Sequence, residues 1–384
     1  MVIYLLFLFL LFVSFWNIRP YGELSYDIQL IILLVYQLWG CYIYRKRPKI
    51  RIKGQYKYLC WVATGIILSM IPAYLFFGQS IIQSFITYRT QFLLCTILTL
   101  LYISPRIEDI IKSLFIFSLI LLIANVLMSK NISMFVIKES TLERIMNSGD
   151  SVKLVGGVEY VTIPLFYYLQ KIKDNFNLSN FIKAMFLLFV IFTVQNRSTL
   201  FPAALFTLYT LFFIRSKYKL LIWITCAILI IAFITQNSVL INELLDETTT
   251  QLNDNDYNRN KAWLYFIFSY SPNWVCYILG NGFISAKTSN IMASLMEMGI
   301  FNADVGFIGY WNHFGIIPII AIITMYVKVL KNKYFPYFVK LIVFFSIICS
   351  LTVLYYGEDV KIAHFAIFYY LFIYYTHKKQ KQII

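Results

Sequence analysis

The stretch LLDETTTQLNDNDYNRNKAW, residues Leu244–Trp263, interrupts a chain that otherwise consists of long apolar runs. It lies within Asn237–Gly315, where the apolar pattern recovers only through ILGNGF (278–283) and ADVGFIGYWNHFG (303–315). Runs outside this segment, such as Val2–Trp16, are apolar on every side of a helix, so they present no amphipathic face suited to a soluble protein. Such runs predict transmembrane helices, and the interruption predicts one large polar loop.

The composition also indicates an integral membrane protein. Hydrophobic residues make up 60% of the chain, and the mean hydropathy is +0.71. The net charge of +15 is explained by membrane topology, so we expect no nucleic-acid partner. The six Cys and three His show no metal-ligand spacing, and the chain has no phosphate-binding Gly loop, zinc-protease motif or nucleotide fingerprint. We therefore expect no metal and no cofactor.

The apolar runs predict an all-α, polytopic membrane protein that forms a single domain over residues 1–384. We expect about twelve spans, at 2–18, 27–44, 58–77, 86–103, 110–128, 154–170, 180–195, 199–214, 219–236, 303–327, 337–355 and 362–376. The semi-polar segment Gly78–Thr87 could be re-entrant.

The large loop, 237–302, lies between the ninth and tenth predicted spans. Its pattern predicts short helices at Ile241–Leu252, Asn258–Tyr270 and Thr288–Met298, with a turn at Gly280–Gly282. The apolar content of these pieces predicts that they lie on the membrane surface or against the bundle.

The basic residues predict the orientation. With both termini cytoplasmic, most of the 33 Lys and Arg residues fall on the inner side and most of the 18 acids on the outer side. The run Arg45–Lys57 (RKRPKIRIKGQYK) is the strongest anchor. The large loop and the shorter loop 129–153 then face outward.

Three arginines are candidates for binding an anion at the outer face. Arg197, in QNRSTLFPAALF, precedes a predicted helix start, where an anion is favoured. Arg89 lies near the outer end of the fourth span, where an ionisable side chain usually faces the bundle or a water-filled cavity. Arg259 shares a helical face with Trp263, and such a pair suits a phosphate and a sugar. The alternatives are that Arg197 snorkels to the membrane interface, that Arg89 pairs with lipid headgroups, and that Arg259 pairs with acids of the loop.

Three further residues are candidate proton acceptors. Asp304 lies at the outer mouth of the tenth span, and His313 lies about nine residues deeper, roughly 13 Å along a helix axis. Glu159 lies a few residues into the sixth span, where an acid is costly unless paired, and an arginine is its expected partner. The alternatives are a helix-capping role for Asp304, a hydrogen-bonded core position for His313 and a purely structural pair for Glu159.

The layout resembles the O-antigen polymerases of the Wzy type and the related O-antigen ligases. The motifs that carry the resemblance are QNRSTL before the eighth span, Arg259 with Trp263, and ILGNGF followed by HFGIIP. The likeness extends over the whole chain in topology and over about 60 residues in motif. Where ligases and many polymerases carry a His-Asn pair, this chain has Ala303-Asp304, which resembles a polymerase variant and leaves the general base open.

The resemblance implies a GT-C-like glycosyltransferase of the bacterial inner membrane with a periplasmic large loop. Its substrate would be an oligosaccharide on undecaprenyl pyrophosphate, with the arginines binding the pyrophosphate and Asp304, His313 or Glu159 accepting a proton. Trp263, Trp274 and Trp311 could stack on sugars, or anchor the protein at the interface. The product would be O-antigen, capsular or exopolysaccharide, and a chain-length regulator is a possible partner. The alternatives are a ligase that acts on lipid A core and a flippase or other transporter.

Overall fold

The computed structural model is all-helical in the residues it describes, apart from one isolated bridge between Ile18 and Phe135. The predicted all-α class is therefore confirmed. The described residues are 1–50, 54–136, 156–194, 196–214, 219–220, 223–224, 258–285, 289, 294–295, 297–298, 300, 302–352 and 359–383. The loop helix predicted at Ile241–Leu252 and most of the predicted ninth span and of Thr288–Met298 lie outside them.

Helices occupy the other predicted spans. They are α1 (Val2–Phe12), α2 (Tyr26–Ile43), α3 (Lys57–Leu68), α4 (Met70–Phe77), η3 (Arg89–Leu94), α6 (Cys95–Ile103), α7 (Ile107–Lys130), α9 (Val158–Asp174), α10 (Leu178–Val194), α11 (Arg197–Phe212), η5 (Asn302–Val305), α17 (Gly306–Phe314), α18 (Ile316–Lys331), α19 (Tyr337–Thr352) and α20 (Asp359–Ile383). In the loops lie α5 (Ile81–Thr87), α14 (Asn258–Phe268) and α15 (Trp274–Leu279). Helix α14 confirms the loop helix predicted over Asn258–Tyr270.

Three of the described helical runs are long and apolar enough to cross a membrane: α2, the run of α3 and α4, and α7. A fourth is obtained if α5 and the run Arg89–Ile103, which are bent by 60° relative to each other, form one broken span. The same bend would also suit a re-entrant loop, so the re-entrant character of Gly78–Thr87 stays a prediction. Helices α1, α10, α11 and α19 are apolar but shorter. The protein therefore has several helices suited to a membrane, and the count of twelve spans stays a prediction.

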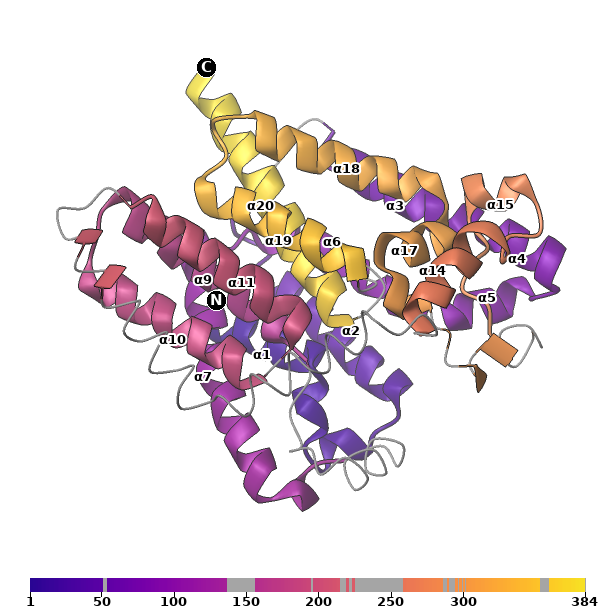
Figure 1. The fold of residues 1–384 in the computed structure, drawn as a ribbon, viewed down its shortest axis with the longest axis horizontal. Helices are drawn as coiled ribbons and strands as arrows, with labels where there is room; N and C mark the ends of the chain where they lie inside the picture. Colours follow the sequence, from indigo (N-terminus) through magenta and orange to yellow (C-terminus); the bar gives the residue numbers. More distant parts are fainter. Residues whose placement is uncertain are drawn as a thin grey trace.

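Helices α9 and α20 form the centre of the bundle (Figure 1). Helix α9 packs against α7, α10, α11 and α19, and α20 is buried on all sides from Ile362 to Ile373. A helix that is apolar all round is expected at such a central position. By contrast, α2 exposes Ile31, Val35 and Leu38, which is the surface expected of a helix that faces lipid.

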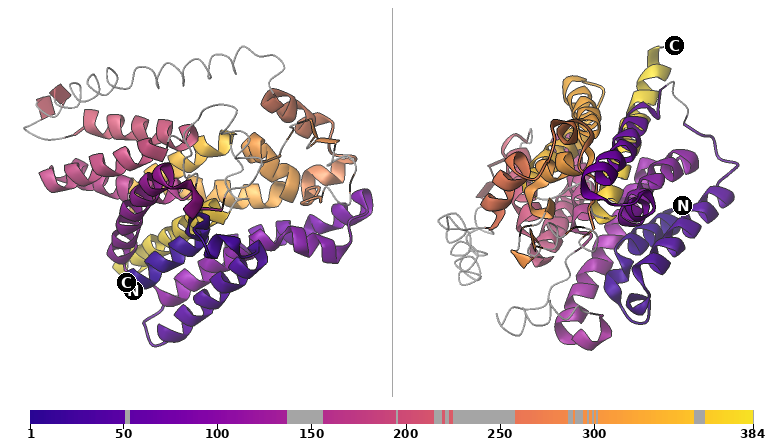
Figure 2. Two further views of the ribbon diagram at one scale, coloured as in Figure 1. Left: turned by 90° about the horizontal axis from the view of Figure 1, so that it is seen from below. Right: turned by 90° about the vertical axis from the view of Figure 1, so that its right-hand side faces the viewer.

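The predicted tenth span is broken in the structure. Residues 303–327 form η5, α17 and α18, and the chain turns at Gly315, whose φ of 74° ends α17. The end of α17 approaches the end of α15 so closely that a Cβ on Gly280 would lie 2.4 Å from the His313 carbonyl oxygen. Figures 1 and 2 show α14, α15 and α17 with α4 and α5 on one side of the molecule, away from α9, α10 and α11.

Candidate functional site

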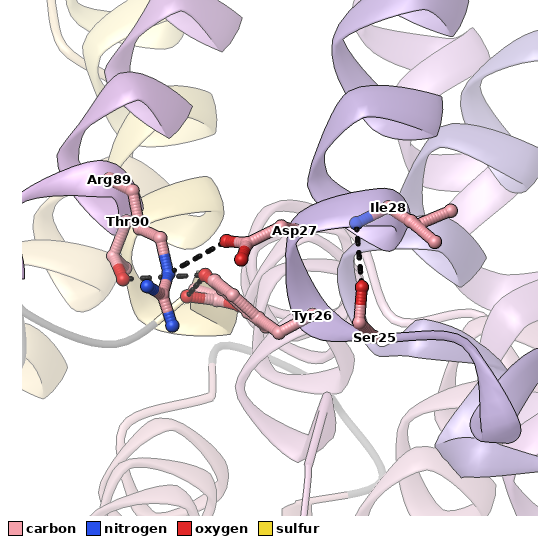
Figure 3. A network of polar contacts seen from close by, with 7 residues as sticks. Ser25, Tyr26, Asp27, Ile28, Arg89 and Thr90 are labelled. Carbon is pink, nitrogen blue, oxygen red and sulfur yellow. Dashed lines mark hydrogen bonds and ion pairs between the residues drawn. The ribbon is translucent and has the colours of Figure 1, made fainter. Parts of the chain in front are cut away.

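A polar network joins the beginnings of α2, η3 and α20 (Figure 3). The Tyr26 hydroxyl donates a hydrogen bond to Oδ1 of Asp359 over 2.9 Å and lies 3.3 Å from the Thr90 hydroxyl. The guanidinium of Arg89 lies over the Tyr26 ring, 5.1 Å from its centroid. Nε of Arg89 is 3.1 Å from Oδ1 of Asp27. Three segments that are distant in sequence therefore meet through one tyrosine.

Arg89 is the accessible part of this network. Its side chain is 39% exposed and that of Asp27 is 65% exposed, and an ion pair this exposed typically contributes at most about 1 kcal/mol. The ion pair therefore contributes little to the stability of the fold. The ion pair uses Nε of Arg89. A guanidinium carries five N–H donors in a planar fork that matches phosphate oxygens, so its other donors can still bind an anion. Arg89 can therefore bind an anion while it contacts Asp27 and Tyr26.

Helix α2 begins at Tyr26 because Ser25 caps its N-terminus. The Ser25 hydroxyl accepts a hydrogen bond from the Ile28 amide over 3.4 Å, which satisfies one free donor of the first turn (Figure 3). Tyr26 and Asp27 are consequently the first two residues of α2. This position directs their side chains toward the end of the bundle where α20 also begins.

Behind Tyr26 and Asp359 the interior is tightly packed. The cavity between them and Leu33 has a volume of about 10 Å³, which is room for roughly one water molecule. This cavity is too small for a sugar. A ligand would therefore reach the network from the side of Arg89.

A second set of polar residues is buried at the same end of the bundle. Glu159, in the first turn of α9, is 5% exposed, and Lys361, in the first turn of α20, is 8% exposed. Both interact electrostatically with the buried Cys349 thiol of α19. Glu159 and Asp359 both interact with the hydroxyl of Tyr160, which is fully buried. A carboxylate and an ammonium thus share one water-poor neighbourhood, where charges are retained only with compensation.

His364 links α20 to α9 within this group. Its Nε2 lies 3.5 Å from the Thr162 hydroxyl, and that hydroxyl donates to the Glu159 carbonyl over 2.7 Å. His364 is fully buried and packs against the Phe345 ring. These contacts fix the first turns of α9 and α20 side by side.

The segments that carry Arg197 and Asp304 reach the same end of the bundle through α19. The Cys349 thiol donates to the Ser198 carbonyl over 3.2 Å, which sets the residue after Arg197 against the end of α19. Gly306, two residues after Asp304, lies so close to α19 that an added Cβ would clash with the Ser350 carbonyl oxygen. The side chains of Arg197, Arg259 and Asp304 lie outside the described part of the structure.

The loop helix α14 connects to this region through η5. Ala262 of α14 and Val305 of η5 are buried in one apolar cluster, and Trp263 packs partly buried at its edge. Arg259 lies one turn before Ala262 on α14. The backbone that carries Arg259 is therefore adjacent to the segment that carries Asp304.

His313 occupies a different place from the polar groups at the start of α20. Its side chain is 3% exposed, and Nδ1 donates to the Gly282 carbonyl over 3.1 Å. Its ring stacks on Phe283 with centroids 4.4 Å apart. The described contacts of His313 thus fasten the Gly280–Gly282 turn to α17, as expected for the alternative of a hydrogen-bonded core histidine.

The other predicted sugar-binding tryptophans differ in exposure. The Trp311 indole donates to the Tyr277 carbonyl over 2.6 Å, and its ring packs 5.7 Å from the Tyr277 ring. Trp274 is 69% exposed. Trp311 therefore joins α17 to α15, and Trp274 presents its ring outward at the start of α15.

Sequence reasoning missed Asp359 and Lys361, because the twelfth span was predicted to begin at 362. The available signal was DVKIAH (359–364), in which an acid, a lysine and a histidine open a long apolar helix. Ionisable residues at such a position are costly and are usually functional or paired. The predicted pairing of Glu159 with an arginine stays a prediction, because the side chains of Arg197 and Arg259 lie outside the described part of the structure.

Within the described ranges, no three His, Cys, Asp or Glu side chains are grouped so that they could hold a metal ion. Neither a protein-family model nor a curated protein sequence matches the chain. The likeness to the O-antigen polymerases and ligases therefore depends on the motifs of the sequence itself.

Proposed function

We propose that the protein is a membrane glycosyltransferase that polymerises oligosaccharide units carried on undecaprenyl pyrophosphate. It would act at the periplasmic face of the bacterial inner membrane, with twelve spans and both termini cytoplasmic. The observation that carries the proposal is the meeting of arginine-bearing and acid-bearing segments at one end of an apolar helical bundle. Arg89 is accessible there, and Glu159, Asp359 and Lys361 lie in the first turns of the adjoining helices.

The chemistry of the substrate matches this set of residues. A hydroxyl oxygen of one lipid-linked unit forms a bond to the anomeric carbon of the growing chain. The bond from that carbon to the pyrophosphate oxygen breaks, and the electron pair leaves with the pyrophosphate. The arginines Arg89, Arg197 and Arg259 stabilise the charge that develops on the leaving group. Attack from the face opposite the leaving group inverts the anomeric configuration.

The proton of the attacking hydroxyl needs an acceptor. Asp304 is the first candidate, because η5 lies against the end of α19 and beside α14. Glu159 is a second, and Asp359 joins the candidates because it lies within reach of the Arg89 network through Tyr26. His313 is less favoured, because its described contacts are with the Gly280–Gly282 turn and Phe283.

The direct test is polymerisation by the purified protein of a purified lipid-linked repeat unit, without added nucleotide. We expect a ladder of chains joined to the lipid. If lipid A core is added as a second acceptor, a ligase would instead transfer single units to it. If no substrate is consumed, or if units are transferred to the core alone, the proposed polymerase activity is rejected.

Variants locate the chemistry within this assay. We expect Arg197→Ala, Arg259→Ala and Asp304→Asn each to lower the rate by about 10²–10³-fold, which is the usual effect of removing one group that stabilises transition-state charge or accepts a proton. Arg47→Ala is the matched control, because Arg47 lies over the Tyr44 ring at the end of α2 remote from Asp27. Full activity of both arginine variants would remove the pyrophosphate clamp from the mechanism.

A further inference from the structure

A second cavity lies at the end of the bundle where α2 ends and α3 begins. It has a volume of about 770 Å³ and opens to the surface between residues 49–50, residues 54–60 and the end of α6. The residues that line it include Lys49, Gln55, Lys57, Cys60, Leu98 and Tyr102. This volume falls in the range of about 300–1,000 Å³ that is typical of small-molecule sites.

The contacts of α20 place this cavity away from the candidate active site. The Tyr369 hydroxyl donates to the Gln55 carbonyl over 2.7 Å and accepts from the Leu59 amide over 3.3 Å. Tyr369 lies ten residues after Asp359 on α20, which is about 15 Å along the helix axis. The cavity therefore belongs to the opposite end of the bundle, where Lys49 and Lys57 lie.

The lining combines two lysines with apolar side chains. Lys49 and Lys57 both line the cavity, and no acidic residue is among the described lining residues. Nζ of Lys49 lies 3.6 Å from the centroid of the Tyr102 ring, and Nζ of Lys57 lies 5.2 Å from that of Trp61. Aromatic contacts of this kind orient an ammonium without neutralising its charge. Both ammonium groups therefore remain able to bind an anion.

Apolar side chains continue from the cavity along the outer surface. Leu98 of α6 is 45% exposed, and Trp61 of α3 is 37% exposed. One turn or two beyond Trp61, Ile67 is 60% exposed on the same helix. A ligand for this surface thus combines a negative head with an apolar tail.

We propose that the cavity binds the headgroup phosphate of an anionic phospholipid, such as phosphatidylglycerol, with Lys49 and Lys57 on the phosphate and the acyl chains along α3 and α6. Basic pockets between membrane helices recognise anionic headgroups in this way. The proposal requires only that the chain is embedded in a membrane. It does not depend on glycosyl transfer.

The test uses the Cys60 thiol, which is exposed and lines the cavity, with phosphatidylcholine as the reference for shielding by any lipid. The full-length protein in detergent is treated with a maleimide in the presence of phosphatidylglycerol, phosphatidylcholine or inorganic phosphate. We expect phosphatidylglycerol alone to slow labelling of Cys60, by about five-fold or more at saturation. The variant Lys49→Gln/Lys57→Gln should lose this protection.

A matched control is Lys171→Gln/Lys183→Gln. These lysines also lie over tyrosine rings, Tyr167 and Tyr168, but on α9 and α10. This variant should keep the protection, and elution of both variants at the wild-type volume in size-exclusion chromatography would show intact folding. Equal protection by phosphatidylcholine, protection by inorganic phosphate alone, or protection that survives in Lys49→Gln/Lys57→Gln would overturn the proposal.

Discussion

The Tyr26 hydroxyl donates a hydrogen bond to Asp359 over 2.9 Å, across a separation of 333 residues. It joins the first turn of an early helix to the first turn of the last one. Arg89 lies over the ring of the same tyrosine, at 5.1 Å. Tyr26 thus links the accessible arginine to the buried polar group around Glu159 and Lys361.

We predict that Tyr26→Phe lowers the free energy of unfolding by about 1.5–3 kcal/mol, because it removes a hydrogen bond to a carboxylate. Unfolding of the detergent-solubilised protein measures this effect. Asp359→Asn and the double variant complete a cycle, in which the two effects should be less than additive. Tyr36→Phe is the control, since the Tyr36 hydroxyl donates to a neutral carbonyl, that of Tyr4, and should cost less. Strictly additive effects would show that the two residues are not coupled.

We predict that Arg89→Ala changes stability by less than about 1 kcal/mol, since its ion pair is exposed. In the polymerisation assay the same variant should be slower by about 10²–10³-fold, if Arg89 binds the pyrophosphate. Asp27→Asn breaks the same ion pair and leaves the guanidinium in place, so it should keep most of the activity. Equal losses in the two variants would indicate that the ion pair matters and the arginine does not act on substrate.

We predict that Gly280→Ala destabilises the protein by about 3 kcal/mol or more. Its φ is 87°, and a Cβ would lie 2.4 Å from the His313 carbonyl oxygen, which cannot move without displacing α17. Gly78→Ala separates the two causes, because Gly78 has a φ of 66° with no atom within 4 Å of the added Cβ. That variant should cost only about 1 kcal/mol. Thermal unfolding of both variants measures the difference, and similar losses would refute the close contact.

We predict that the Cys276 thiol reacts slowly with maleimide. Cys276 is fully buried in α15, and this burial raises the pKa of its thiol above the ordinary value. The thiolate is the reactive form, so raising the pKa lowers the reactive fraction at neutral pH. Single-cysteine variants that retain Cys276 or the exposed Cys60 allow a direct comparison between pH 7 and 9, with Cys60 at least roughly ten-fold faster at pH 7. Equal rates would contradict the packing of α15.

The raised pKa also has a consequence for stability. A thiol whose pKa is higher in the folded state than in the unfolded state contributes stability that is complete below the unfolded pKa and is lost as the pH rises through the folded pKa. We expect Cys276→Ser to remove part of the alkaline loss of stability. An unfolding series at pH 7 to 10 measures this, and an unchanged alkaline slope would argue against the thiol.

The charge count predicts that the end of the bundle with Lys49 and Lys57 is cytoplasmic. A membrane-impermeant thiol reagent should therefore label Cys60 in inverted membrane vesicles and not in right-side-out vesicles. Labelling of Cys60 from the periplasmic side would reverse the topology. That result would place the Arg89 network in the cytoplasm and remove the basis of the proposed function.

The helical segments could be predicted from the amino-acid pattern alone, because a helix satisfies its own backbone hydrogen bonds and an apolar run of sufficient length favours it locally. For that reason α7, α9 and α14 appear where the pattern predicted them. Charge asymmetry similarly predicts an orientation, since it depends on where residues fall between spans. Arg89 and Glu159 also stand out in the sequence, because an ionisable residue in an apolar run is conspicuous.

The contacts between these residues could not be predicted in the same way, because they depend on how the helices pack. No local preference indicates that Tyr26 contacts Asp359, that Glu159 and Lys361 act electrostatically on Cys349, or that the ILGNGF turn packs on His313. Such contacts arise from the packing of helices that are distant in the chain, and packing depends on the shapes of many side chains at once. The break of the predicted tenth span at Gly315 has the same origin, because only a residue without a Cβ allows α15 and α17 to approach so closely.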